Sequence, residues 1–222
     1  VHAGQPMAAS ITQATEIGTL YSLEQIEEIA GICREAGIPL HLDGARFANA
    51  LVSLDTTPAE MTWKRGVEIA SFGGTKNGCW CAEAIIVFDP AKIGQMHFLR
   101  KRAAQLFSKS RFIAAQFEAY FRDDLWLKNA RHANAMAAEL ATAISNADGA
   151  RLAWQPQANE VFALMKDEKA QALQAAGAQF YPWKPPLSFA GEMTAGNTLY
   201  RFVTSFATEA ADIQKCAEAL KA

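Results

Sequence analysis

The sequence predicts an α/β fold with a mainly parallel sheet, followed by a small α+β C-terminal domain. In the first half of the chain, short apolar segments alternate with segments of helical periodicity, which is typical of strands joined by crossover helices. Charged residues follow the ends of two of these apolar segments. After a long helical region, short strand-like and helical segments alternate again, which predicts the second domain.

The first predicted unit is a strand-like segment followed by a helix. Residues 10–22 alternate β-branched and polar side chains, and Ser22 with Gln25 three positions later forms a capping-box signal. A helix should therefore begin after Ser22, and Gly37 should end it after Ala36. The residues at helical spacing are Leu23, Ile26, Ile29, Ala30 and Cys33.

The next segments continue the pattern of strand, helix and strand. Residues 38–43 form a short apolar strand with Asp43 at its C-terminal end, and residues 47–54 form a helix. Residues 67–72 and 82–89 are two more strands, and Lys76 follows the first of these. Ligands of parallel sheets bind beyond the carboxyl ends of the strands, so we expect Asp43 and Lys76 on one rim.

The second half of the chain begins with long helical patterns. Residues 96–120 read as one long helix and residues 125–144 as another, with a domain change in this region. We therefore expect a partial large domain over residues 1–122 and a small domain over residues 123–222. The small domain's predicted elements are residues 151–165, a helix near 169–176, residues 178–183, residues 198–206 and a last helix from Glu209.

Composition excludes several classes of partner. The formal net charge of −2 provides no field for nucleic acid or an anionic membrane, so small-molecule or protein partners are expected. The four cysteines show neither a secreted framework nor paired zinc-ligand spacing, which indicates a reducing compartment and no metal site. No apolar stretch is long enough to span a bilayer, and we expect a cytoplasmic protein.

Lys76 lies in the segment SFGGTKNG, between glycines that allow a tight turn. A lysine amine becomes a good nucleophile when desolvation or a nearby cation lowers its pKa, but an isolated lysine in such a turn is more often simply solvated. Asp43 lies 33 residues earlier and is followed by Gly44 and Arg46. It can accept a charge-assisted hydrogen bond from a ligand, or it can cap the helix that follows.

Together these segments resemble a known enzyme family. LHLDGARFANA followed by SFGGTKNG is similar to the pyridoxal-phosphate enzymes of fold type I, and within them to the low-specificity L-threonine aldolases and β-eliminating lyases. Residues 12–22, 100–116 and 200–206 resemble the same group, so the resemblance covers nearly the whole chain. It implies the large and small domains of the aspartate aminotransferase-like fold.

The resemblance implies a role for each of four residues. Lys76 holds the aldehyde of pyridoxal 5′-phosphate, and Asp43 pairs with the pyridine nitrogen and keeps it protonated. Arg46 lies beside the cofactor and binds the substrate carboxylate, with Arg201 as the second arm of the clamp. Without the resemblance, a surface salt bridge is an equally good interpretation of Arg201.

The resemblance also implies the reaction and the assembly. The expected reaction is cleavage of L-threonine, L-allo-threonine and related β-hydroxy-α-amino acids to glycine and an aldehyde by a homodimer or homotetramer. β-Elimination, transamination and a non-catalytic module are the alternatives. The glycine-rich phosphate turn and the ring-stacking residue of such enzymes are not recognised before Asp43, and the chain begins with Val1, so we expect the C-terminal portion of a longer enzyme.

Overall fold

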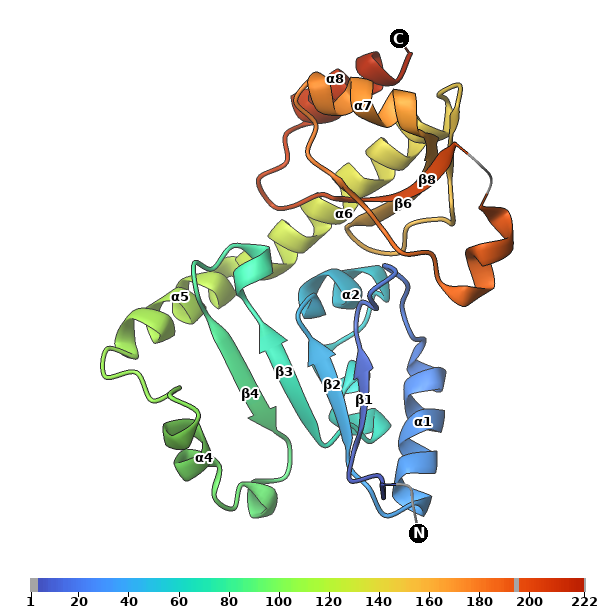
Figure 1. Ribbon diagram of the computed structural model, residues 1–222. Helices are drawn as coiled ribbons and strands as arrows, with labels where there is room; N and C mark the ends of the chain where they lie inside the picture. The colour runs from blue at the N-terminus through green and yellow to red at the C-terminus, as the bar shows by residue number, and fades with distance from the viewer. Residues whose placement is uncertain (1–3, 194–195, 222) are drawn as a thin grey trace. The chain divides into compact units, whose positions relative to one another are not determined.

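The computed structural model of the chain describes residues 4–193 and 196–221 (Figure 1). Val1, on which the expectation of an upstream portion partly depends, lies outside these residues. The chain forms two compact units. The first consists of Val1–Ala14 and Tyr21–Lys128, and the second of Thr15–Leu20 and Asn129–Ala222. The chain passes between the units at residues 14–15 and 20–21, and again at residues 128–129 within helix α6 (Leu125–Ser145).

Sheet A forms the centre of the first unit. Its strands, in spatial order, are β1 (Ala9–Thr12), β2 (Leu40–Gly44), β3 (Ile69–Gly73) and β4 (Glu83–Val87). β1, β2 and β3 are mutually parallel, and β4 is antiparallel to β3. The predicted mainly parallel sheet is therefore confirmed.

The two faces of sheet A differ in polarity. Leu40 and Leu42 of β2 are fully buried, whereas His41 and Asp43 between and after them point to the opposite face and are half-buried. Three of the four register partners of His41 and Asp43 on the neighbouring strands are polar, namely Ser10, Thr12 and Ser71, and the fourth is Ile69. Strands of parallel sheets are usually apolar on both faces. The alternation in β2 therefore indicates that the polar face has a role other than packing.

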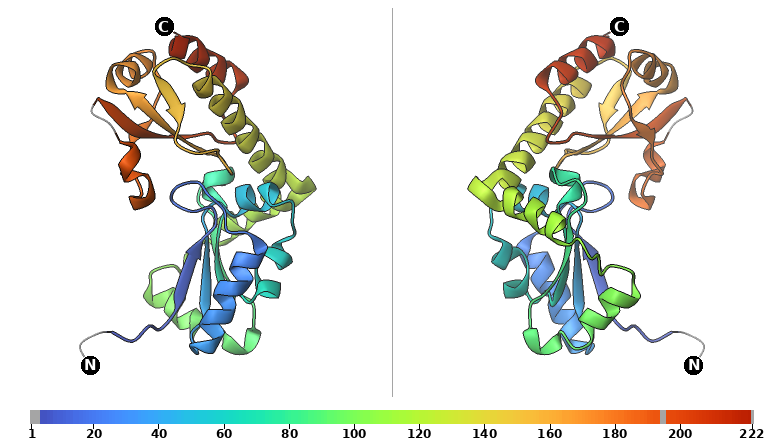
Figure 2. Two further views of the ribbon diagram at one scale, coloured as in Figure 1. Left: turned by 90° about the vertical axis from the view of Figure 1, so that its right-hand side faces the viewer. Right: turned by 90° about the vertical axis from the view of Figure 1, so that its left-hand side faces the viewer.

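Within residues 4–14 and 21–124, five helices and four 3₁₀ turns accompany sheet A. The helices are α1 (Leu23–Glu35), α2 (Phe47–Ser53), α3 (Pro58–Met61), α4 (Met96–Arg102) and α5 (Arg111–Phe121). The 3₁₀ turns are η1 (Trp63–Arg65), η2 (Thr75–Asn77), η3 (Pro90–Lys92) and η4 (Arg122–Asp124). α1 lies on one face of sheet A (Figure 2) and buries Ile26, Ala30 and Cys33. Its capping box is formed as predicted, because Ser22 and Gln25 exchange side-chain and backbone hydrogen bonds.

The prediction of one long helix over residues 96–120 is wrong. α4 ends at Arg102 and α5 begins only at Arg111. Ala104 between them has a left-handed φ of 57°, which an α-helix cannot contain. The intervening segment also carries Ser108 and Ser110, which compete for backbone hydrogen bonds and favour turns. Apolar spacing on both sides of the break concealed it in the sequence.

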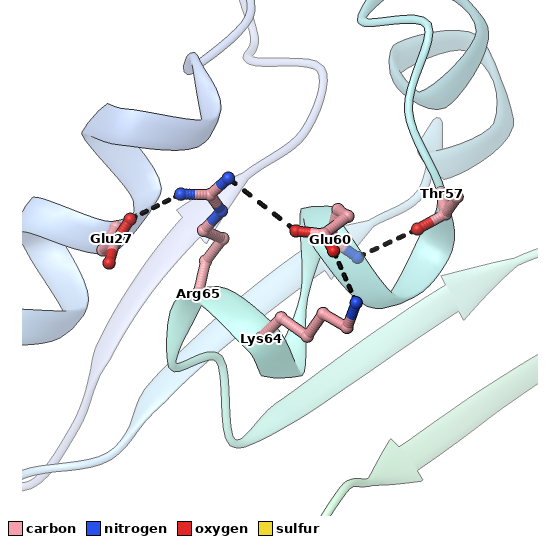
Figure 3. A network of polar contacts seen from close by, with 5 residues as sticks. All are labelled: Glu27, Thr57, Glu60, Lys64 and Arg65. Atoms are coloured by element: carbon pink, nitrogen blue, oxygen red, sulfur yellow. Dashed lines mark hydrogen bonds and ion pairs between the residues drawn. The ribbon is translucent and has the colours of Figure 1, made fainter.

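A network of charged side chains joins α1 to the α3–η1 segment (Figure 3). The Arg65 guanidinium donates to Glu27 of α1 at 2.5 Å and lies 3.7 Å from Glu60 of α3. Lys64 also donates to Glu60, and Thr57 caps α3 by accepting a hydrogen bond from the Glu60 amide. Because these side chains are 25–59% exposed and water screens their charges, the network fixes orientation more than it adds stability.

The second unit contains sheet B, with the antiparallel order β5 (Ala150–Leu152), β6 (Glu160–Lys166), β8 (Asn197–Val203) and β7 (Tyr181–Pro182). Its helices are α6, α7 (Asp167–Ala175), α8 (Ala210–Lys221) and the 3₁₀ segment η5 (Leu187–Glu192). One core contains Val161 and Met165 of β6 with Leu140, Leu173 and Leu220 of the helices. The expectation of an α+β domain is confirmed. Within the described ranges, no helix combines the length and apolar character that crossing a bilayer requires.

Two glycines allow the ends of β2 and β3 to pack closely. A Cβ on Gly44 would lie 2.7 Å from the Ser71 carbonyl oxygen, and a Cβ on Gly73 would lie 2.9 Å from the Ala45 carbonyl oxygen. Both contacts are with backbone atoms, which cannot rotate away. The loops that follow Asp43 and precede Lys76 can therefore lie against each other only because neither position carries a side chain.

Replacing Gly73 by alanine should lower the free energy of unfolding by about 2 kcal/mol, because the added methyl group overpacks a backbone contact. Gly31 in α1 is the matched control, since a Cβ there meets nothing within 4 Å. Gly31→Ala should instead raise stability by about 0.5–1 kcal/mol through helix propensity. Urea denaturation of both variants checks the two signs, and equal effects would contradict the close approach.

Candidate active site

Asp43 occupies the C-terminal end of β2 on the polar face of sheet A. Its Oδ1 accepts a hydrogen bond from the Ala45 backbone N–H at 3.0 Å, which is an Asx turn. It does not cap the following helix, because the residue before α2 is Arg46. Among the described residues, none donates a hydrogen bond to Oδ2. The carboxylate therefore has a fixed orientation and one oxygen available for a ligand.

Lys76 lies in η2, directly after β3, and its side chain is exposed. No hydrogen bond or ion pair to its amine occurs within residues 4–193 and 196–221. Gly78 ends the turn with a φ of 121°, a conformation that other residues rarely adopt. The chain thus presents an amine without a protein partner at the same edge of sheet A as Asp43.

The residue after the lysine fixes the turn. Asn77 is buried, and its Nδ2 donates to the Tyr120 hydroxyl at 2.6 Å and to the Trp126 carbonyl oxygen at 2.8 Å. On the other side of Lys76, the Thr75 backbone N–H donates to Glu83 of β4. The turn is anchored on both sides, so the lysine side chain can move while its backbone does not.

His41 links three strands of sheet A beside Asp43. Its Nδ1 is 2.8 Å from the Ser10 hydroxyl of β1, and its Nε2 is 3.0 Å from the Ser71 hydroxyl of β3. Since Ser71 is the register partner of Asp43, these hydrogen bonds hold the strands that carry the site in alignment. Its two partners lie 31 and 30 residues away in the chain, so no local spacing in the sequence indicates these contacts.

The two arginines predicted to bind a carboxylate lie in different units. Arg46 is half-buried before α2, next to Asp43 in the first unit. Arg201 is in β8 of the second unit, so the structure groups three of the four predicted residues in one unit and leaves Arg201 in the other. Arg201 is not in a surface salt bridge, because its partner is the buried carboxylate of Glu160 at 3.6 Å.

Sequence reasoning missed Glu160 and Asn77. Glu160 opens the apolar strand β6, and its side chain has 0% exposure. A charged residue directly before an apolar run was the available signal, but such residues usually lie at strand ends in solvent. Asn77 gave no signal, because its partners are 43 and 49 residues away in the chain.

Residues 1–168 match the sequence profile of a family described as β-eliminating lyase. The chain belongs to this family. It is 38% identical over 221 residues to the low specificity L-threonine aldolase of Pseudomonas aeruginosa, and equally identical to that of a Pseudomonas species. These alignments cover the whole chain but 61% of each relative, so the chain spans about three fifths of their length.

Solved structures are also similar to this chain. A threonine aldolase from Leishmania major superposes with a TM-score of 0.86 at 30% identity, covering 97% of this chain and 60% of that one. A structure from Listeria monocytogenes, named as an L-allo-threonine aldolase, superposes with a TM-score of 0.75 at 18% identity. The match covers 96% of this chain and 60% of that one, and it supports the fold alone. The resemblance to fold type I threonine aldolases is confirmed.

Enzymes of this family depend on pyridoxal 5′-phosphate. Two groups in the described part of the first unit fit this cofactor. The Lys76 amine, which has no protein partner there, fits the aldehyde, and the Asp43 Oδ2, which accepts no hydrogen bond there, fits the pyridine N–H. Both groups follow the carboxyl ends of adjacent parallel strands, where ligands of α/β sheets bind. The chemistry of Lys76 and Asp43 therefore agrees with the family's cofactor.

The anchor of the lysine turn predicts a dependence of stability on alkaline pH. Burial raises the pKa of Tyr120 to about 12, although the hydrogen bond from Asn77 lowers it. In the unfolded chain the phenol ionises near its ordinary pKa of about 10. The unfolded state therefore loses its proton first, and stability should fall as the pH rises from about 10 to about 12.

Urea denaturation across that pH range checks this expectation, with Tyr120→Phe as the test variant. Phenylalanine has no proton to lose, so the variant's stability should fall less steeply with pH. Tyr181 is exposed on β7 and gives the control Tyr181→Phe, which should leave the slope unchanged. Parallel slopes for all three proteins would contradict the assignment.

Proposed function

We propose that the whole protein is a pyridoxal-phosphate-dependent lyase that cleaves L-threonine, L-allo-threonine and related β-hydroxy-α-amino acids to glycine and an aldehyde. The amine of Lys76 carries this proposal, because it lies on an anchored turn and has no protein partner in the part of the chain that the structure describes. The names of the similar proteins from Pseudomonas and Leishmania give the substrate class.

Each predicted residue has a task that its chemistry can perform. The Lys76 amine would hold the cofactor by its aldehyde, a role that needs a flexible side chain on a fixed backbone. Asp43 accepts the pyridine N–H through its available oxygen and keeps that nitrogen protonated. The bound cofactor supplies an electron sink for the Cα–Cβ bond that breaks.

Arg46 and Arg201 bind and orient the substrate. A planar guanidinium matches a carboxylate with two parallel hydrogen bonds, which fixes the amino acid in one orientation. Orientation decides which bond at Cα breaks, so a clamp on the carboxylate serves the reaction as well as affinity. Arg46 also contributes to the cofactor site, because it is close to Asp43 in the chain.

The assignment of the parts follows from the same proposal. Residues 1–122 belong to the cofactor-binding domain and residues 123–222 to the small C-terminal domain, a boundary close to but not identical with that of the compact units, which change at Lys128 and Asn129. The protein acts in the cytoplasm as a homodimer or homotetramer. Exposed apolar side chains of the first unit support self-association: Phe98, Leu99, Leu106, Phe107 and Phe112.

Replacing Lys76 by alanine in the whole protein should reduce threonine cleavage by about a thousandfold or more, because no other group takes its place in holding the cofactor. Lys64→Ala removes an exposed lysine of the same unit and should have no effect. Glycine and aldehyde should be the products of the unaltered protein. Pyruvate and ammonia instead would show β-elimination, and threonine cleavage that survives in Lys76→Ala would refute the proposed role.

Asp43→Asn should lower kcat/KM on the order of a hundredfold, since losing a charge-assisted hydrogen bond in the transition state costs about 3 kcal/mol. Asp89 gives a matched control, because its Oδ1 accepts the same Asx-turn hydrogen bond from Ala91 at 3.0 Å. Asp89→Asn should leave kcat/KM unchanged. Equal losses in both variants would assign Asp43 to the turn alone.

A further inference from the structure

Sheet B holds a buried carboxylate next to Arg201 that the proposed reaction does not use. Glu160 begins β6, and its side chain has 0% exposure. Arg201 of β8 is the register partner of Phe162, so Glu160 is its diagonal neighbour on the same face. The Glu160 Oε1 and the Arg201 Nη1 are 3.6 Å apart.

The backbone around Glu160 is fixed by its neighbours. Asn159 donates from Nδ2 to the Thr204 carbonyl oxygen at 2.6 Å, and Thr204 donates from Oγ1 to the Ala133 carbonyl oxygen of α6 at 2.7 Å. Gly18, with a φ of +70°, lies so close that a Cβ there would be 3.1 Å from the Glu160 Cβ. The segment that contains Gly18 therefore packs against the base of the Glu160 side chain, and the backbone that carries the carboxylate is held in place.

An aromatic ring fixes the guanidinium from its face. The Cζ of Arg201 lies 3.9 Å from the ring centroid of Trp183, which in turn packs edge-on against Phe162 at 6.1 Å. Such a stack holds the plane of the guanidinium and leaves its N–H groups at the edge free to bind. Among the described residues, none accepts a hydrogen bond from the Arg201 Nε.

Burying a carboxylate and a guanidinium together adds little to stability, because the desolvation cost offsets the attraction. An apolar pair of the same size would serve the core of sheet B as well. The pair instead fixes the orientation of the Arg201 guanidinium, which has five N–H donors. Glu160 lies near only one of its nitrogens, Nη1.

We propose that Glu160 and Trp183 are positioning residues for Arg201, which together aim its guanidinium at the carboxylate of the amino-acid substrate. This inference depends on the proposed function, because the substrate role of Arg201 is part of it. Glu160 restricts one end of the guanidinium and Trp183 restricts its plane. A substrate carboxylate then meets a preorganised donor fork and loses less entropy on binding.

The second unit offers a matched control. Arg151 pairs with Glu192 at 2.8 Å and lies over the Phe189 ring at 5.7 Å, but both charged side chains are about half exposed. This is the same combination of arginine, carboxylate and ring, without the burial. Glu192→Gln should therefore leave substrate binding unchanged.

The test measures the dissociation constant of glycine by titration calorimetry on the cofactor-loaded whole protein, together with KM and kcat for L-threonine. Glu160→Gln should raise the glycine constant and KM by about tenfold, the loss expected when a charged partner of a binding group is neutralised, with kcat changed by less than about threefold. Glu160→Asp keeps the charge and should recover part of the affinity. Unchanged values in Glu160→Gln would overturn the inference.

A double-mutant cycle separates a positioning role from a structural one. If Glu160 acts through Arg201, Glu160→Gln should add less than about a twofold change in an Arg201→Gln background. Two effects that simply multiply would overturn the inference while leaving the proposed function standing. Unaltered protein that neither cleaves threonine nor binds glycine would overturn the proposed function itself, and this inference with it.

Trp183→Leu provides a second route if Glu160→Gln does not fold. Removing the ring frees the plane of the guanidinium and should also raise the glycine constant by about tenfold, since the arginine loses its stacked partner. Circular dichroism confirms that each variant is folded before titration. A folded Trp183→Leu variant with the original glycine affinity would overturn the inference.

Discussion

The parallel pairing of β2 with β3 is the constraint on which the candidate site depends. It brings the carboxyl ends of two strands to one edge of sheet A, so that Asp43 and the turn of Lys76 lie there although 33 residues separate them. Gly44 and Gly73 let the two loops pack backbone against backbone. His41 adds a side-chain link across three strands at the same place. Backbone pairing and His41 maintain this alignment. Among the described residues, the Lys76 amine and one Asp43 oxygen therefore have no partner and can bind a ligand.

Much of the fold could be predicted because its signals are local. The capping box at Ser22, the strand that ends at Asp43 and the helix that begins near Leu125 each depend on neighbours a few residues away. The break after Arg102 could not be predicted in the same way, because apolar spacing continues on both sides of it. A left-handed residue such as Ala104 carries no signal of its own in the sequence.

The same distinction between local and distant signals applies to the residues of the candidate site. Residues that follow strand ends, such as Asp43 and Lys76, could be proposed from the order of the elements. Residues that act through distant partners could not be proposed in this way. Asn77 holds the lysine turn through Tyr120, and Glu160 of β6 pairs with Arg201 of the neighbouring strand β8. Their importance comes from packing, which is set by the whole unit, and no spacing in the sequence encodes it. In the second unit, the surroundings of Arg201 therefore became visible only in the structure.

The proposed function depends most directly on Lys76 as the residue that binds the cofactor. The most direct test loads the whole protein with pyridoxal 5′-phosphate, reduces it with borohydride so that the cofactor is fixed to its lysine, and maps the labelled peptide. The expected result is a single labelled peptide that contains Lys76. Label on other lysines, such as Lys64 or Lys109, with the Lys76 peptide unmodified would contradict it.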